Sequence, residues 1–259
     1  GCMAVAVRAA AFAALLRFVV VALPGLADHW YGLISVLAVL TMTAGNLLAL
    51  VQTSIKRMLA YSSIAHAGYL MLGVLAILAP GRGAAGTLTF EPGGVVEAAG
   101  SGVLFYLLGY SLMNLAAFGV ISQLGRTAGD EADEIDHYRG LAARQPGSAT
   151  IMTVAMLSLA GIPGTVGFLG KFYVFEAVIR AGLVPLAIWG VVNSLLSVYY
   201  YIRLIVVMFF SDAAEDPYDG RNWETSVLAA CMALLVIVLG IYPVVAHRAA
   251  AVAFGTILG

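Results

Sequence analysis

Residues 157–172 read LSLAGIPGTVGFLGKF, an apolar run that glycine and proline interrupt. This run lies inside a longer apolar segment, 149–180, which exceeds the roughly 20 residues of one straight membrane crossing. Pro163 lacks a backbone N–H and the neighbouring glycines loosen the main chain, so we predict a helix broken at 161–167. Irregular backbone at membrane depth is stable only where protein or a water-filled cavity surrounds it, which indicates a transport site.

The rest of the chain is equally apolar. Of its 259 residues, 62% are hydrophobic and 10% are charged, whereas a typical soluble domain is about 25% charged. The net charge of -1 leaves no basic excess for binding nucleic acid. Cys2 and Cys231 lie alone in apolar runs, which argues against a disulfide framework, a cysteine-ligated cluster or a thiol redox site. We therefore predict an all-α polytopic membrane protein that contacts the lipid bilayer.

Seven apolar segments are long enough to cross a bilayer as helices. They are approximately 2–23, 31–51, 57–79, 97–124, 149–180, 185–210 and 225–245, the last followed by a short apolar tail. Basic residues favour the second, fourth and sixth connections, which the positive-inside rule places in the cytoplasm. The first residue is not a start methionine and the first segment lacks a signal-peptide cleavage site, so we expect the protein to continue upstream.

Titratable side chains are rare within membrane helices, because inserting a charge into the hydrocarbon core costs at least ~2.5 kcal/mol. Each one is therefore a candidate functional residue. Among those in the predicted spans we single out Arg8, His66, Lys171, Glu176 and Arg203. Lys171 follows Pro163 by eight residues, well inside its span. Since a lysine can release its proton when it is removed from water, we expect Lys171 to carry protons. A lysine that snorkels to the interface, or one paired structurally with Glu176, remains the alternative.

One span contains two further candidates. His66 is the tenth residue of the predicted span 57–79, and its imidazole titrates near neutral pH, which suits a proton relay. A buried histidine with satisfied hydrogen bonds is the competing interpretation. Lys56 and Arg57 stand at the start of the same span, where two basic residues are typical of a topology anchor.

Two spans each carry a polar stripe, because polar residues recur every four positions along one helix face. The stripes are Tyr106, Tyr110 and Asn114 in one span and Asn193, Ser197 and Tyr201 in the other. If the stripes face one another, they can hold a file of water. Interhelical hydrogen bonding explains them equally well.

Two strings carry a family resemblance. Residues 45–69 read GNLLALVQTSIKRMLAYSSIAHAGY, and with the string 157–172 they resemble the antiporter-like membrane subunits of respiratory complex I, most closely those of the N type. The resemblance covers essentially the whole chain. It implies two inverted five-helix repeats, each with a discontinuous helix and a half-channel, of which this chain would hold the second. On that basis 1–30 ends the first repeat, 31–210 forms the second, and 211–259 forms a loop with a C-terminal helix.

The resemblance also assigns residues to a proton pathway. Lys171 matches the lysine of the second broken helix, and Lys56 matches a basic residue at the start of the family's tenth helix. Arg8 falls where the family usually has a lysine, and an arginine keeps its proton where a lysine can titrate. Together with His66 and Glu176, these residues form the predicted pathway.

The implied function is that of a non-redox, proton-translocating subunit of an NADH:quinone oxidoreductase in the inner (plasma) membrane of a bacterium. NAD, FMN, iron–sulfur clusters and quinone would bind to other subunits, and the chain would contact other membrane subunits of the complex. A subunit of a monovalent cation/proton antiporter and a purely structural scaffold are the alternatives. The broken helix and Lys171 argue against a scaffold, since packing alone requires neither. The N-like strings argue against the antiporter.

Overall fold

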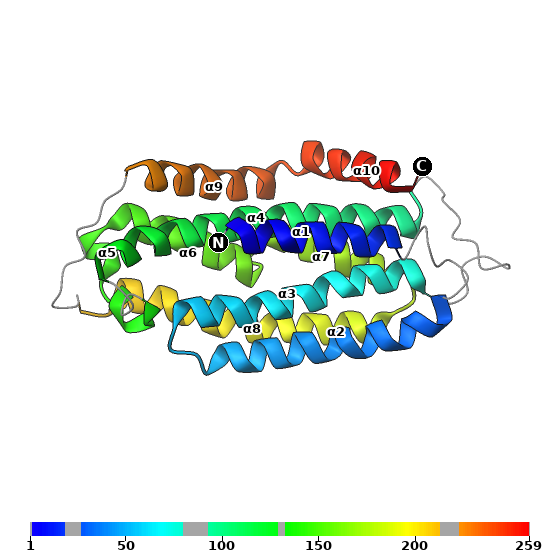
Figure 1. The fold of residues 1–259 in the computed structure, drawn as a ribbon, viewed down its shortest axis with the longest axis horizontal. Coiled ribbons are helices and arrows are strands. Elements are labelled where there is room, and N and C mark those ends of the chain that lie inside the picture. Colours follow the sequence, from blue (N-terminus) through cyan, green and yellow to red (C-terminus); the bar gives the residue numbers. More distant parts are fainter. Residues whose placement is uncertain (1, 19–26, 80–92, 129–132, 213–222, 259) are drawn as a thin grey trace.

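The chain folds into a bundle of helices that lie along one long axis (Figure 1). The computed structural model describes residues 2–18, 27–79, 93–128, 133–212 and 223–258. Within these ranges the regular structure is helical, apart from one antiparallel bridge between Ser54 and Glu134. The predicted all-α class is therefore confirmed.

The helices follow one another as the hydropathy pattern predicts, with shorter helices between the spans. They are α1 (Cys2–Arg17), α2 (Ala27–Leu50), α3 (Ile55–Leu78), α4 (Val95–Ala128), η4 (Ile135–Tyr138), α5 (Leu141–Arg144), α6 (Pro146–Ala160), α7 (Val166–Arg180), α8 (Val184–Phe210), α9 (Trp223–Ile241) and α10 (Val244–Leu258).

Five of the described helices are long and apolar enough to cross a membrane, namely α2, α3, α4, α8 and α9. The predicted span 149–180 is instead the pair α6 and α7, separated at 161–165, so the predicted break is confirmed. α1 covers the first part of the predicted span 2–23, while 19–26 lies outside the described residues. The apolar tail after residue 245 belongs to the helix α10, which follows an interruption at Pro243.

The helices differ in their burial, and the difference defines the centre of the bundle. Within the most apolar 18-residue window of each span, 72% of α3 and 67% of α4 is buried, against 33% of α2 and α8 and 17% of α9. The outer faces carry large apolar side chains such as Leu195, Leu234 and Val245. Soluble proteins rarely expose an apolar surface of this extent to water, so we infer that the lipid bilayer covers it. The helices α3 and α4 therefore form the buried centre of the bundle.

The break between α6 and α7 depends on two glycines. Gly161 ends α6 with φ of +87°, a left-handed conformation that a side chain disfavours. Gly167 lies against the end of α6, where an added Cβ would be 1.9 Å from the main-chain oxygen of Ser158. The Gly167 N–H also donates to the Ser158 hydroxyl at 3.1 Å. The two half-helices are thus held in direct contact across the break.

Candidate functional site

The break holds Lys171, whose side chain is only 4% exposed. Its Nζ donates to the main-chain oxygens of Leu159 and Ala160, at 3.0 and 3.1 Å, and lies 2.9 Å from the Ser194 hydroxyl on α8. α6 has 15 residues, so the break lies about 22 Å from its start, within a hydrocarbon layer of about 30 Å. The lysine ammonium therefore sits at membrane depth, on the negative end of the α6 dipole.

The lysine completes the hydrogen bonding of the α6 terminus. A helix leaves its last four carbonyls without intrahelical partners. Those of Leu157 and Ser158 accept from the N–H of Gly161, at 3.1 and 3.0 Å, and the two that follow accept from Lys171. All three ammonium hydrogens have an acceptor, because the Ser194 oxygen takes the third. The charged form of the lysine is thus solvated by the protein in place of water.

The structure supports neither alternative for Lys171, a side chain that snorkels to the interface or a structural pair with Glu176. The side chain is buried and bonded at the break, so it does not snorkel to an interface. Glu176 pairs with Arg180 at 2.6 Å rather than with Lys171, and the other ion pair among the described residues joins Lys56 to Asp133. Within the described part of the chain, Lys171 therefore has no acidic partner.

A second polar centre lies on α3, the most buried span. His66 is buried, and both of its ring nitrogens contact phenol hydroxyls: Nδ1 that of Tyr106 on α4, and Nε2 that of Tyr201 on α8, at 3.2 Å. A hydroxyl can donate or accept, so either neutral tautomer of the imidazole finds partners. Tyr69 and Tyr110 pack against the imidazole, with ring centroids 5.7 and 5.1 Å away.

Asn46 on α2 connects the two centres. Its Nδ2 donates to the Tyr69 hydroxyl at 3.1 Å and to the main-chain oxygen of Asn193 at 3.0 Å. Its Oδ1 accepts from the Tyr200 hydroxyl at 2.9 Å. The Lys171 ammonium lies 5.2 Å from the centroid of the Tyr69 ring, a cation–π distance. Asn46 thus joins α2, α3 and α8 beside the lysine.

These contacts form one cluster, which we call the buried polar network. It consists of Lys171, Ser194, Tyr69, Asn46, Tyr200, Tyr201, His66 and Tyr106. Seven of these residues are buried, and Ser194 is half-buried. The contact between Lys171 and Tyr69 is not a hydrogen bond, because the ammonium faces the Tyr69 ring and not its hydroxyl. A proton that crosses that step needs the hydroxyl of Ser194 or a water molecule.

The two predicted polar stripes meet in this network. Tyr106 comes from one stripe and Tyr201 from the other, and both contact His66 between them. Asn114 instead donates to the Tyr110 carbonyl of its own helix, at 2.8 Å. The stripes are therefore joined through α3 by side-chain contacts, as the hydrogen-bonding interpretation predicts.

Lys56 and Arg203 lie outside the network. Lys56 is half exposed at the start of α3, ion-paired with Asp133. Arg203 donates to the main-chain oxygen of Gln52 at 3.3 Å, just past the end of α2. Arg8 lies on α1, but its side chain falls outside the described residues. Of the four predicted pathway residues whose side chains are described, the structure therefore brings together only Lys171 and His66.

Glu176 lies on the same helix as Lys171 but faces a different space. With Arg180 it lines a cavity of about 250 Å³ between α4, α7 and α10, which Glu97 and His247 also line. The cavity lies toward the C-terminal end of α7, and the start of α6 is at the opposite end of the bundle (Figure 1). Sequence analysis missed Glu97 and His247, because residues from three separate helices form this cavity.

No metal site is apparent in the ranges that the structure describes, where three or more His, Cys, Asp or Glu side chains never gather closely enough to hold an ion. An ammonium, an imidazole and several phenols can accept, hold and release protons.

Comparison with known sequences agrees with this architecture. Residues 2–90 and 93–197 match the family model described as NADH:quinone oxidoreductase/Mrp antiporter, transmembrane. A relative from Trichlorobacter lovleyi, named NADH-quinone oxidoreductase subunit N, is 46% identical over 90% of this chain and 43% of its own length. A relative of the same name from Myxococcus xanthus is 44% identical over 93% of this chain and 49% of its own length. The chain spans about half the length of these curated relatives.

Solved structures show the same fold. A chain of respiratory complex I from Thermus thermophilus with bound aureothin matches with a TM-score of 0.67 at 30% identity, over 84% of this chain and 45% of that chain. A chain of the Mrp complex from a Dietzia species matches with a TM-score of 0.70 over 89% of this chain and 49% of that chain, but its 19% identity shows the fold alone. The apolar helices and the bacterial relatives identify a multi-pass inner-membrane protein of bacterial type.

Proposed function

The chain belongs to the NADH:quinone oxidoreductase/Mrp antiporter membrane family, and we propose that it is part of a proton-translocating, non-redox subunit of an NADH:quinone oxidoreductase. The observation that carries this proposal is the placement of Lys171. Its ammonium is buried at a helix break, bonded to two carbonyls and a hydroxyl, and has no acidic partner among the described residues. A structural scaffold has no need of such a group, since burying it is costly.

In the proposed mechanism, Lys171 alternates between ammonium and amine. The ammonium donates three hydrogen bonds, whereas the amine donates two and accepts one. The two α6 carbonyls can only accept, so the bond that must reverse is the one to Ser194. The hydroxyl of Ser194 can do so by rotating its hydrogen toward the amine. Both protonation states of Lys171 are therefore satisfied without movement of a helix.

His66 is the proposed partner of Lys171 in proton transfer. Its two nitrogens contact hydroxyls on opposite sides, so the imidazole can take a proton at one nitrogen and release one from the other. Lys56 and Arg8 complete the pathway that the family resemblance assigns. The surface position of Lys56 restricts it to the cytoplasmic mouth of that pathway.

Glu176 is proposed to act at the opposite end of this pathway. It lines the cavity with Glu97 and His247, and α7 links that cavity to Lys171. Carboxylates and an imidazole near a membrane surface can exchange protons with water. The cavity is therefore the proposed site at which protons leave the half-channel.

The redox chemistry is assigned to other parts of the enzyme. We propose that NAD, FMN, iron–sulfur clusters and quinone bind to other subunits, and that the outer faces of this chain contact neighbouring membrane subunits as well as lipid. Redox energy would then reach Lys171 as a change in its surroundings rather than as an electron.

Proton pumping by the complete enzyme tests the proposal. Lys171→Met, introduced into the full-length subunit, removes the titratable group and keeps an unbranched apolar chain of similar length. We expect NADH-driven acidification of inverted membrane vesicles to fall strongly at an equal amount of assembled complex. Arg57→Gln, which removes an exposed cation outside the network, is the control and should pump normally. Normal pumping by the Lys171→Met enzyme would contradict the proposed role.

A further inference from the structure

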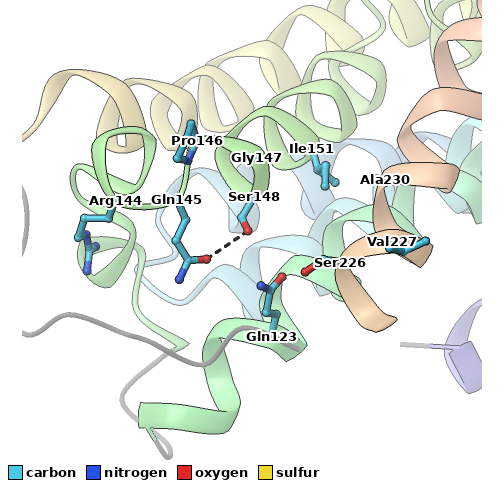
Figure 2. A pocket seen from close by; sticks show the side chains of 10 residues that line it. All are labelled: Gln123, Arg144, Gln145, Pro146, Gly147, Ser148, Ile151, Ser226, Val227 and Ala230. Atoms are coloured by element: carbon cyan, nitrogen blue, oxygen red, sulfur yellow. Dashed lines mark hydrogen bonds between the residues drawn. The ribbon is translucent and has the colours of Figure 1, made fainter. Parts of the chain in front are cut away.

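A cavity of about 470 Å³ lies where α4 ends and where α6 and α9 begin. Its polar lining comes from Gln123, Arg144, Gln145, Ser148 and Ser226. Figure 2 shows Gln123, Gln145 and Ser148 pointing toward the same space, with the Ser148 hydroxyl bonded to Gln145 at 3.2 Å. The distribution of basic residues places this end of the bundle at the cytoplasmic surface. The cavity is remote from the buried polar network.

One wall of the cavity is the start of α6. Helices leave their first backbone N–H groups unsatisfied and carry a positive partial charge there. At α6 no side chain caps this end, because the residue before the helix, Gln145, makes no side-chain capping bond. The N–H groups of the first turn are therefore available to an anion, an arrangement typical of phosphate sites.

Gln123 provides a second, independent indication. Its side chain is 3% exposed, on the last turns of α4, and it lines the cavity. Figure 2 shows no hydrogen bond between its amide and the other residues that line the cavity. An amide that faces a cavity can donate a hydrogen bond to a group that occupies it.

The charge of the lining favours an anion. Arg144 is the one charged residue in the lining as described, and no acidic side chain belongs to it. The guanidinium is held in place by bonds to the main-chain oxygens of His137 and Arg139, at 3.3 and 2.9 Å. A cation, a helix N-terminus and an amide thus line the same cavity. Phosphate oxygens accept from all three kinds of donor.

The remaining wall is apolar and continuous with the outside of the bundle. Ile151, Val227 and Ala230 line the cavity, and the last two are exposed on the outer face of α9. A few residues further along α9, Leu234 is 61% exposed on the apolar surface. A ligand with a phosphate and a hydrocarbon chain can therefore place the phosphate in the cavity and the chain along α9. A free phosphate would leave the apolar wall uncovered.

We propose that this cavity binds the phosphate of an anionic membrane phospholipid, with the acyl chains lying along α9. Basic pockets between helices on the cytoplasmic side are a recurrent means of binding acidic head groups. The site does not depend on the proton-transfer role of Lys171. It gives the cytoplasmic ends of α4, α6 and α9 a common ligand.

Lipid retention by the full-length subunit in its assembled complex tests the proposal. The complex is purified, delipidated, and exposed separately to detergent micelles containing phosphatidylglycerol, to micelles containing phosphatidylcholine and to inorganic phosphate. Native mass spectrometry then measures the retained lipid, and thermal unfolding measures stabilisation. The test variants are Gln123→Leu and Arg144→Gln. The controls are Ser122→Ala, which alters the exposed neighbour of Gln123, and Arg139→Gln, which removes an exposed arginine nearby.

We expect phosphatidylglycerol to be retained and to raise the unfolding temperature in the wild type and both controls. Loss of one charge-assisted contact should weaken retention about tenfold in each test variant. Phosphatidylcholine should be retained less, because its choline brings a second cation toward Arg144. Equal retention of phosphatidylglycerol by all variants would show that the lipid does not bind in this cavity. Stabilisation by inorganic phosphate without lipid retention would overturn the lipid assignment.

Discussion

The Nζ of Lys171 and the Oγ of Ser194 lie 2.9 Å apart, and this contact joins the broken helix to α8. Of the three groups around the ammonium, the hydroxyl is the one that can both accept and donate. The two carbonyls fix the position of the lysine, and the serine accommodates a change in its charge. In the proposed mechanism, Ser194 is therefore a positioning residue for proton release.

The first prediction concerns this serine. Ser194→Ala removes a hydrogen bond to a charged group, worth about 1.5–3 kcal/mol, and leaves the neutral amine without a donor. We expect the pumping rate to fall about tenfold at normal assembly. Ser194→Thr keeps the hydroxyl and should restore most of the rate. If alanine and threonine at this position behave alike, the hydroxyl has no part in the transfer.

The second prediction concerns the imidazole. His66→Gln keeps hydrogen-bonding groups between Tyr106 and Tyr201 but cannot titrate near neutral pH. We expect the complex to assemble and the pumping rate to fall by about 100-fold, which is the lower end of the range for lost general acid–base catalysis. Vesicle acidification measures the rate, and blue-native electrophoresis measures assembly. Unchanged pumping would leave His66 as a structural histidine.

The third prediction tests the packing of the break. Gly167→Ala places a Cβ against the main-chain oxygen of Ser158, where no flexible side chain can yield. Overpacking of this kind costs about 1–3 kcal/mol, so we expect a lower unfolding temperature of the complex. Gly255→Ala adds the same methyl to α10, where nothing lies within 4 Å, and should be neutral or stabilising. Equal stability of the two variants would show that α6 and α7 can separate at the break.

The fourth prediction concerns the ion pair at the start of α3. The Lys56 side chain is 51% exposed and that of Asp133 is 30% exposed, so solvent and salt screen the pair. A double-mutant cycle with Lys56→Gln and Asp133→Asn should give a coupling energy below about 1 kcal/mol in thermal unfolding. A larger coupling would mean that the pair is shielded from water in the complete subunit.

Sequence patterns predicted the features that depend on local residue chemistry. Glycines around Pro163 predicted the break, and apolar spacing predicted the spans. The partners of Lys171 could not be predicted, since two are main-chain oxygens and the third comes from a helix 23 residues away in the chain. Asn46 was missed because nothing in an apolar run of α2 indicates that it meets α3 and α8. Helix α10 was not predicted as a separate helix, because the predicted span 225–245 runs through Pro243 and only a short apolar tail follows it.

The central claim is that Lys171 serves as a proton carrier and not merely as a cap on α6. Lys171→Arg separates the two roles, because a guanidinium can bond the carbonyls of Leu159 and Ala160 but keeps its proton. The decisive measurement is the number of protons pumped per NADH oxidised by the complex that contains this variant, compared with Lys171→Met. We expect Lys171→Arg to assemble and unfold like the wild type while pumping as poorly as Lys171→Met. Full pumping by the arginine enzyme would contradict the account, because a fixed cation would then suffice.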